Sequence, residues 1–87
     1  MHETGLVRDL LRRIEEVARQ EGARRVTAVS VRLGALSHLS PEHFTEHFRA
    51  AARGGIAEGA RLEIAVDRDP HHPEAQWLRL EEVELDV

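Results

Sequence analysis

The spacing of apolar residues predicts a helix near the start of the chain. Apolar side chains recur there at intervals of three and four residues, which places them on one stripe of a helix. These positions are Val7, Leu10, Leu11, Ile14, Val17 and Ala18. Thr4 or Gly5 is expected to be the N-cap, and Gly22 is expected to end the helix in the left-handed conformation. We therefore expect a helix from about Gly5 to about Glu21.

The apolar period changes to two over residues 26–33, which predicts a half-buried strand ending at Gly34. One face of this strand would carry Val29, Val31 and Leu33, and the other Ala28, Ser30 and Arg32. A second helix should follow, because Ser40 suits an N-cap and Pro41 suits the first helical position. Its expected inward residues are Phe44, Phe48, Ala51 and Ala52, and Gly54 and Gly55 are expected to end it.

Two further strands are expected in the last third of the chain. Leu62, Ile64 and Val66 alternate with polar residues, and the final strand should begin near Trp77. In that final strand the apolar positions change from even to odd numbers, so one residue near Glu81 or Glu82 should form a bulge. These elements predict one α+β domain over residues 1–87, with two helices packed on one face of a small mixed or antiparallel sheet.

Composition argues against several functions. Sixteen acidic and twelve basic residues alternate along the chain, so no basic block suggests nucleic-acid binding. No apolar run is long enough for a membrane span, and no secretion signal is apparent, which makes the cytoplasm the expected location. Cysteine and tyrosine are absent, and neither a Gly-x-Ser-x-Gly motif nor a phosphate-binding glycine loop occurs. We therefore do not expect an enzyme.

Histidine is the one residue type that suggests specific chemistry, with six copies in 87 residues. His2 follows the first residue, where the α-amine, a deprotonated amide and the imidazole can close adjacent chelate rings around one metal ion. A planar set of nitrogen donors suits Ni(II) or Cu(II) better than tetrahedral Zn(II). An ordinary exposed terminal residue is the alternative interpretation of His2 taken alone.

The other histidines are candidate auxiliary metal ligands. His43 and His47 are four residues apart, so both would lie on one side of the second helix, and His38 precedes that helix. His71 and His72 are adjacent in a segment bounded by two prolines. Exposed helix side chains and a plain turn are the simpler interpretations of these two groups.

Several segments together resemble the HypA/HybF family of hydrogenase nickel-incorporation proteins. They are Met1–Glu3, 22–27, 31–37, 40–42 and 56–64, so the resemblance extends from Met1 to about Val66. It implies that the Met1 amine, the His2 imidazole and nearby backbone nitrogens, including that of Glu3, bind Ni²⁺. It also implies a maturation GTPase of the HypB type as partner, and delivery of nickel to a [NiFe] hydrogenase large-subunit precursor.

The chain departs from the family pattern after its third predicted strand. Family members carry a zinc ribbon with two Cys-x-x-Cys pairs there, whereas residues 67–76 form a short segment without cysteine. A cysteine zinc site is therefore excluded, and we expect a short turn that joins the two flanking strands. One alternative function is a metal-free domain that binds the GTPase or a hydrogenase subunit. A metal-dependent enzyme using His43, Glu46 and His47 is the weakest alternative. Separately, an exposed closing strand could pair between two chains and form a homodimer.

Overall fold

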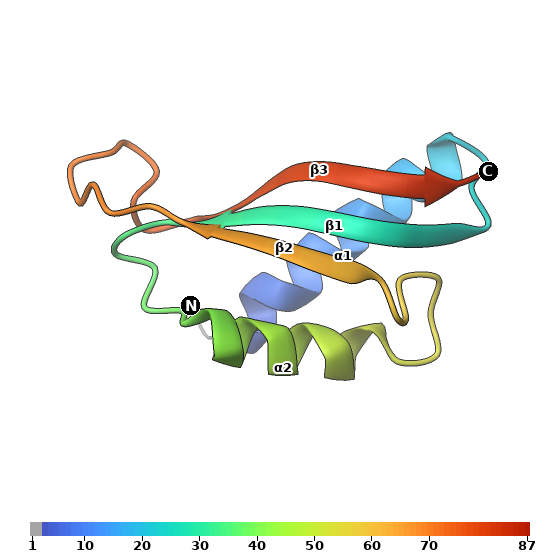
Figure 1. The fold of residues 1–87 in the computed structure, drawn as a ribbon, viewed down its shortest axis with the longest axis horizontal. Helices are drawn as coiled ribbons and strands as arrows, with labels where there is room; N and C mark the ends of the chain where they lie inside the picture. The colour runs from blue at the N-terminus through green and yellow to red at the C-terminus, as the bar shows by residue number, and fades with distance from the viewer. Residues whose placement is uncertain (1–2) are drawn as a thin grey trace.

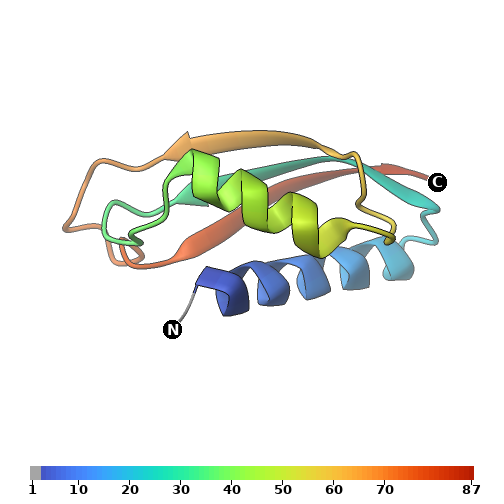
Figure 2. The same cartoon turned by 90° about the horizontal axis from the view of Figure 1, so that it is seen from below.

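Two helices cover one face of a three-stranded sheet in the computed structural model, which describes residues 3–87. The elements are α1 (Glu3–Gln20), β1 (Arg25–Leu33), α2 (Pro41–Ala52), β2 (Arg61–Val66) and β3 (Leu78–Asp86). The strand order is β2-β1-β3, with β1 parallel to β2 and antiparallel to β3. Figures 1 and 2 show both helices on the same side of this sheet. The predicted α+β architecture with a mixed sheet is confirmed.

Helix α1 is held by the predicted apolar stripe, but its start differs from the prediction. Five of the six stripe residues are buried: Val7, Leu10, Leu11, Ile14 and Ala18. The helix ends as predicted at Gly22, whose φ is 68°, while Ala23 N–H donates to Ala18 O and Gly22 N–H donates to Arg19 O. It begins at Glu3, so Thr4 and Gly5 lie inside it and the predicted N-cap is wrong. Relative to alanine, threonine or glycine within a helix lowers its stability by no more than about 1 kcal/mol. Burial of the apolar stripe contributes more than this loss.

The pairing of β1 with β3 contains two irregularities. Ser30 pairs with Glu82 and Val31 with Leu80, so Glu81 is the extra residue of a bulge, as the change of apolar phase predicted. A second register shift lies between Val26 and Ala28 and was not predicted. It brings Val26 into the core with the odd-numbered valines of the strand.

Helix α2 begins as predicted. Ser40 is the N-cap and accepts a hydrogen bond from His43 N–H at 3.1 Å, and Pro41 occupies the first turn. Phe44, Phe48 and Ala52 are buried against α1 and the sheet. Ala51 is exposed, so its predicted inward position is wrong, because it lies 100° around the helix from Ala52 and faces away from the core.

Residues 67–77 do not form the expected short turn between adjacent strands. Since β2 and β3 lie on opposite sides of β1, this connection crosses the end of the central strand (Figure 1). Its backbone is bonded to the segment after β1: Asp67 N–H donates to Leu33 O at 2.8 Å, Gly34 N–H to Trp77 O at 3.0 Å, and Leu36 N–H to Ala75 O at 2.7 Å. Because of the strand order, residues 67–77 are a crossover connection that packs against the segment after β1.

Gly34 permits this docking, because a Cβ atom at this position would overlap the carbonyl group of Ala75. Gly34→Ala is therefore expected to destabilise the fold by about 1–3 kcal/mol, the usual cost of overpacking. It should also change the fluorescence of Trp77, the only tryptophan. Gly55→Ala is the matched control, because its Cβ would meet only ordinary contacts. Equal urea midpoints for the two variants would contradict the prediction.

Candidate metal site

The predicted nickel ligands lie at the start of α1. Met1 and His2 are outside the described residues, and Glu3 is the first residue of the helix. The first four backbone N–H groups of an α-helix have no partner within the helix. The Glu3 amide nitrogen, which the family resemblance assigns as a ligand, is therefore not needed for the hydrogen bonding of α1.

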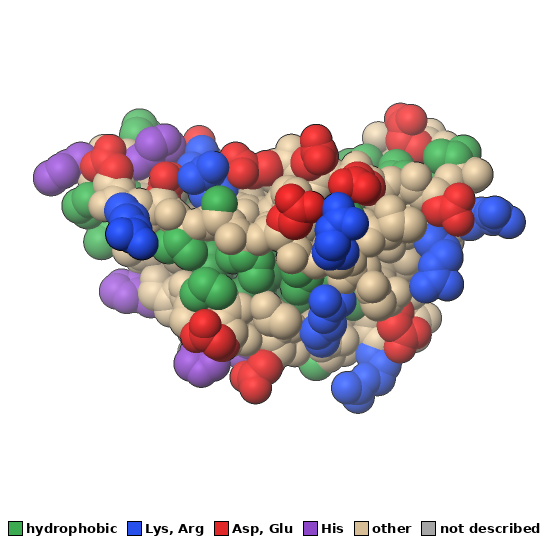
Figure 3. All heavy atoms as spheres, in the orientation of Figure 1, with side chains coloured by type: hydrophobic (Ala, Val, Ile, Leu, Met, Phe, Trp, Pro, Cys, Tyr) green, Lys and Arg blue, Asp and Glu red, His purple; other side chains and the backbone are tan. Residues whose placement is uncertain are grey.

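The remaining histidines gather at the same end of the molecule as the start of α1 (Figures 1 and 3). They lie on the 67–77 connection, on the segment that precedes α2 and on α2 itself. Within residues 3–87, however, no group of three or more histidine, aspartate or glutamate side chains is arranged to hold a metal ion. His43 and His47 are close in sequence, as are His71 and His72. Neither pair is part of a site with three side-chain ligands.

His72 has a structural role in the crossover. Its Nδ1 accepts a hydrogen bond from Glu74 N–H at 3.0 Å. Asp69 Oδ1 accepts from His71 N–H at 2.9 Å, so both residues belong to a turn closed by side-chain acceptors. A neutral imidazole with an acceptor Nδ1 carries its proton on Nε2, which leaves no lone pair for a metal ion in this arrangement.

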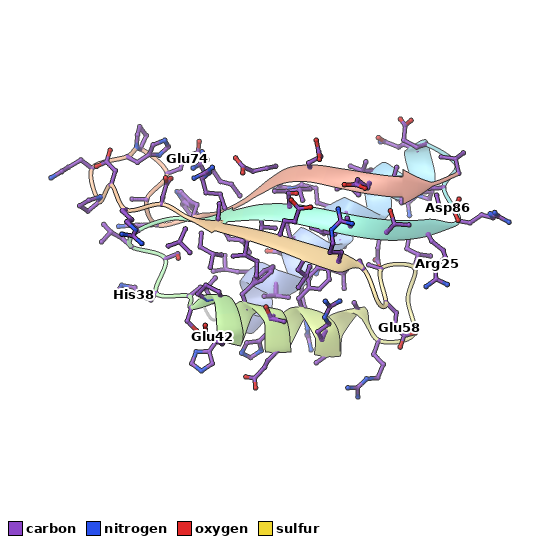
Figure 4. The ribbon with its side chains drawn as sticks, in the orientation of Figure 1. Arg25, His38, Glu42, Glu58, Glu74 and Asp86 are labelled. Atoms are coloured by element: carbon purple, nitrogen blue, oxygen red, sulfur yellow. The ribbon has the colours of Figure 1, made fainter. Side chains whose placement is uncertain are left out.

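His38 lies on the rim of a cavity beside the start of α1. This cavity of about 380 Å³ is lined by Leu6, Leu36, Ser37, His38, Gln76 and Trp77. His38 is the only non-glycine residue with a positive φ among those described, at 60°. Leu36 is 40% exposed and Trp77 is 51% exposed, so the cavity has a partly open apolar wall. Figure 4 places His38 on the connection leading to α2, at the same end of the fold as Glu74.

Ion pairs fix the crossover to the sheet. Asp67 binds Arg79 at 2.8 Å and Arg32 at 3.4 Å, and Arg32 also binds Glu81 at 3.3 Å. The hydrogen bond and charge of Glu81, with a smaller contribution from Asp67, raise the pKa of Arg32. These contacts stabilise the short connection between β2 and β3 and offer no metal site of their own.

A second ion-pair group crosses the exposed face of the sheet at Ala28. Arg61 of β2 contacts Glu63 at 2.9 Å and Glu84 of β3 at 3.1 Å. Both Arg61 and Glu84 pair with Ala28 in the strand register, and the small Ala28 side chain lets them meet above it. The hydrogen bond to Glu63 and the charges of Glu84 and Glu63 raise the pKa of Arg61. This face is therefore charged and internally paired.

Comparison with solved structures shows that this fold is known. The solution structure of the Ni metallochaperone HypA from Helicobacter pylori matches with a TM-score of 0.83 at 20% identity, covering 100% of this chain and 99% of that one. A second solution structure, of a HypA protein, matches with a TM-score of 0.75 at 21% identity, over 98% and 96% of the two chains. The fold is that of the HypA metallochaperones. Among residues 3–87, no helix is long and apolar enough to cross a membrane.

Sequence comparison then identifies the family. Residues 1–70 match the family described as "Hydrogenase/urease nickel incorporation, metallochaperone, hypA". Hydrogenase maturation factor HypA of Archaeoglobus fulgidus is 41% identical over 68 residues, covering 78% of this chain and 62% of that protein. The protein of the same name from Rhodopseudomonas palustris strain BisB5 is 48% identical over 64 residues, covering 74% and 57%. The chain belongs to the HypA family, and its matched part spans about three fifths of the length of these relatives.

The cavity beside α1 was not found by sequence reasoning. Leu6, Leu36 and Trp77 belong to three segments that are distant in the chain. The only signal was an aromatic residue directly after the 67–76 segment. The sequence predicts a strand that begins near Trp77, and the structure agrees, with Trp77 just before β3 and half exposed.

Proposed function

We propose that this chain is a nickel carrier that binds one Ni(II) ion through its first residues. The ligands would be the Met1 amine, the His2 imidazole and backbone nitrogens, including that of Glu3. The observation that carries this proposal is the family match, which starts at residue 1 and thus includes the Met1-His2-Glu3 sequence. The position of Glu3 at the start of α1 supports it, because the first amide of a helix has no hydrogen-bond partner within that helix.

The chemistry of this ligand set fits a carrier. Amine, amide and imidazole nitrogens favour Ni(II) or Cu(II) over metals that prefer oxygen or thiolate ligands. Each donor must lose its proton before it binds, so protons and Ni(II) compete for the same atoms. The ion can therefore be bound or released by exchange for protons on nitrogen, with no other covalent bond of the protein formed or broken.

The names of the relatives indicate where the nickel would go. Those proteins are hydrogenase maturation factors, and the family description refers to nickel incorporation into hydrogenase or urease. We propose a [NiFe] hydrogenase large-subunit precursor as the recipient, a GTPase of the HypB type as the partner, and the cytoplasm as the location. The candidate auxiliary histidines are not required for this role.

Native mass spectrometry with one equivalent of Ni(II) tests the proposal. The chain with a free Met1 amine is compared with the same chain acetylated at that amine, which removes one ligand without changing a side chain. We expect the free form to bind one nickel ion and the acetylated form to bind much less. Equal uptake by the two forms would reject the proposed site. It would favour a domain that binds maturation proteins without carrying nickel at its amino terminus.

A further inference from the structure

The outer edge of β2 carries backbone groups that no other described segment pairs with. Asp67 N–H donates to Leu33 O, and the direction of the backbone groups alternates along a strand, so the odd-numbered residues of β2 bond toward β1. The N–H and C=O groups of Leu62, Ile64 and Val66 therefore point away from the sheet. We propose that this edge pairs antiparallel with the same edge of a second copy of the chain, which joins two sheets in a symmetric dimer.

The side chains at the same three positions form an apolar stripe beside α2. Leu62 and Ile64 are partly buried against the core, and Val66 is 48% exposed. Figure 3 shows hydrophobic side chains between β2 and α2 on the face turned toward the reader. The fold leaves this stripe partly open to water, and a strand added at the edge would cover it.

One antiparallel register makes the apolar stripe complementary to itself. With Ile64 on the two-fold axis, Leu62 lies opposite Val66 of the partner subunit, and the two copies of Ile64 lie side by side. Apolar residues then meet along the whole helix side of the paired strands. A register centred on Leu62 would leave Val66, the most exposed residue of the stripe, beyond the paired strands.

The charges on the open face of the sheet suit the same register. Arg61 would lie opposite Asp67 of the partner subunit, which pairs unlike charges. Glu63 would lie opposite the uncharged Ala65 of the partner subunit. A register centred on Glu63 would instead place two carboxylates directly opposite each other, which is destabilising. The register centred on Ile64 is therefore favoured on both faces of the sheet.

Helix α2 supplies an independent charge complementarity. It lies beside β2 and runs in the opposite direction (Figure 1). Four exposed residues at helical spacing form one stripe, acidic in its first half and basic in its second: Glu42, Glu46, Arg49 and Arg53. Arg49 donates to Ala60 O, directly before β2, so this stripe faces the β2 edge. A two-fold axis through Ile64 places the two α2 helices side by side and antiparallel, with the acidic half of each facing the basic half of the other.

The edge of β3 is less suited to a dimer, although an exposed closing strand is what the sequence suggested. The bulge at Glu81 interrupts this strand, and bulges and charges protect sheet edges from pairing. Its exposed acidic side chains are Glu81, Glu82, Glu84 and Asp86. Antiparallel pairing of two β3 strands would bring these acids together. The strand β2 has neither a bulge nor a proline, so it is the edge that a second copy can extend.

The size of this interface predicts a weak dimer. Standard protein–protein interfaces have about 20–30 residues on each side, whereas residues 61–67 and the stripe on α2 supply fewer. The dimer should therefore form only as the protein concentration rises. Its contacts do not include the proposed nickel ligands, so the dimer can be tested without metal.

Sedimentation velocity from micromolar to millimolar protein, with a chelator present, tests the dimer. We expect the wild-type chain to change from monomer to dimer across this range. Val66→Lys should dimerise at least about tenfold more weakly, because it places a charge opposite Leu62 of the partner subunit twice in each symmetric interface. Val87→Lys is the matched control, since Val87 is an exposed valine after β3 and should leave dimerisation unchanged.

Charge exchange on α2 tests how the two copies are arranged. Glu42→Arg and Arg53→Glu should each weaken the dimer, because each change places like charges across the two-fold axis. A one-to-one mixture of the two variants should dimerise as readily as the wild type, since each variant presents the charge that the other lacks. Circular dichroism of each variant checks that the monomers are folded. A mixture that dimerises no better than either variant alone would contradict this arrangement.

Amide hydrogen exchange locates the paired edge. In the dimer the amides of Leu62, Ile64 and Val66 should exchange more slowly than in the monomer. Slowed exchange confined to Val83 and Leu85 would show that β3 pairs instead, and would overturn the proposal. A wild-type chain that stays monomeric, or a dimer that Val66→Lys does not weaken, would overturn it as well. None of these outcomes bears on nickel binding by the first residues.

Discussion

Replacing His2 with alanine is expected to lower the affinity for Ni(II) by at least about a hundredfold. Loss of a residue that merely supports a metal ligand costs about 10- to 100-fold in affinity, and His2 is the only side chain in the proposed terminal ligand set. Its imidazole also anchors the ion while the neighbouring amide nitrogens lose their protons. Competition against a chelating dye of known nickel affinity measures the effect.

As a control, His2→Ala should leave the fold unchanged. His2 precedes Glu3, the first residue of α1, so the far-ultraviolet circular dichroism of His2→Ala should match that of the wild type. His43→Ala, which removes an exposed histidine from α2, should retain wild-type affinity. A His2→Ala chain with wild-type affinity would show that the nickel ion, if bound, is held elsewhere.

Most of the fold follows from local patterns in the sequence. The apolar stripe of α1 and the Ser40-Pro41 start of α2 each depend on neighbouring residues, and both are seen in the structure. The bulge at Glu81 was predictable because apolar residues flank it in two different phases. The same signal exists in β1, where Val26 is out of phase with Val29, but a single residue on one side is too short a pattern to identify a bulge.

The parts that could not be predicted depend on how distant segments meet. The course of residues 67–77 follows from the position of β1 between β2 and β3, and no local pattern encodes a strand order. The need for glycine at position 34 arises only when Ala75 packs against it. In the same way the cavity near α1 exists because the crossover brings Trp77 beside Leu36.

The candidate metal site also has a part that the sequence predicts and a part that only the structure shows. The nickel ligands Met1, His2 and Glu3 are contiguous, so a chemical argument and a family resemblance can name them from the sequence. They stay a prediction, because Met1 and His2 lie outside the described residues. His38 was one of five candidate auxiliary histidines in the sequence. The structure adds what the sequence could not give, namely that His38 lines a cavity and that His72 Nδ1 accepts the Glu74 N–H.

The core prediction with the largest expected effect concerns Phe48. Phe44 and Phe48 are fully buried, their ring centroids are 5.8 Å apart, and they are the only phenylalanines in the chain. Phe48→Ala should destabilise the fold by about 3–5 kcal/mol, since truncating a buried aromatic ring leaves a cavity that the surroundings fill only in part. Small domains have about 5–15 kcal/mol of stability in total, so this loss is a large fraction of it.

Urea unfolding followed by far-ultraviolet circular dichroism and by Trp77 fluorescence measures the loss. The matched control is Ala51→Gly, an exposed position on the same helix, where only the helix propensity changes and about 1 kcal/mol should be lost. Phe48→Leu leaves a smaller cavity, so its loss of stability should lie between those of Phe48→Ala and Ala51→Gly. It can be measured even if Phe48→Ala does not fold. Both probes should shift together, because Phe48 is in the one core that α1, α2 and the sheet share. A smaller loss for Phe48→Ala than for Ala51→Gly would mean that the two phenylalanines do not hold this core together.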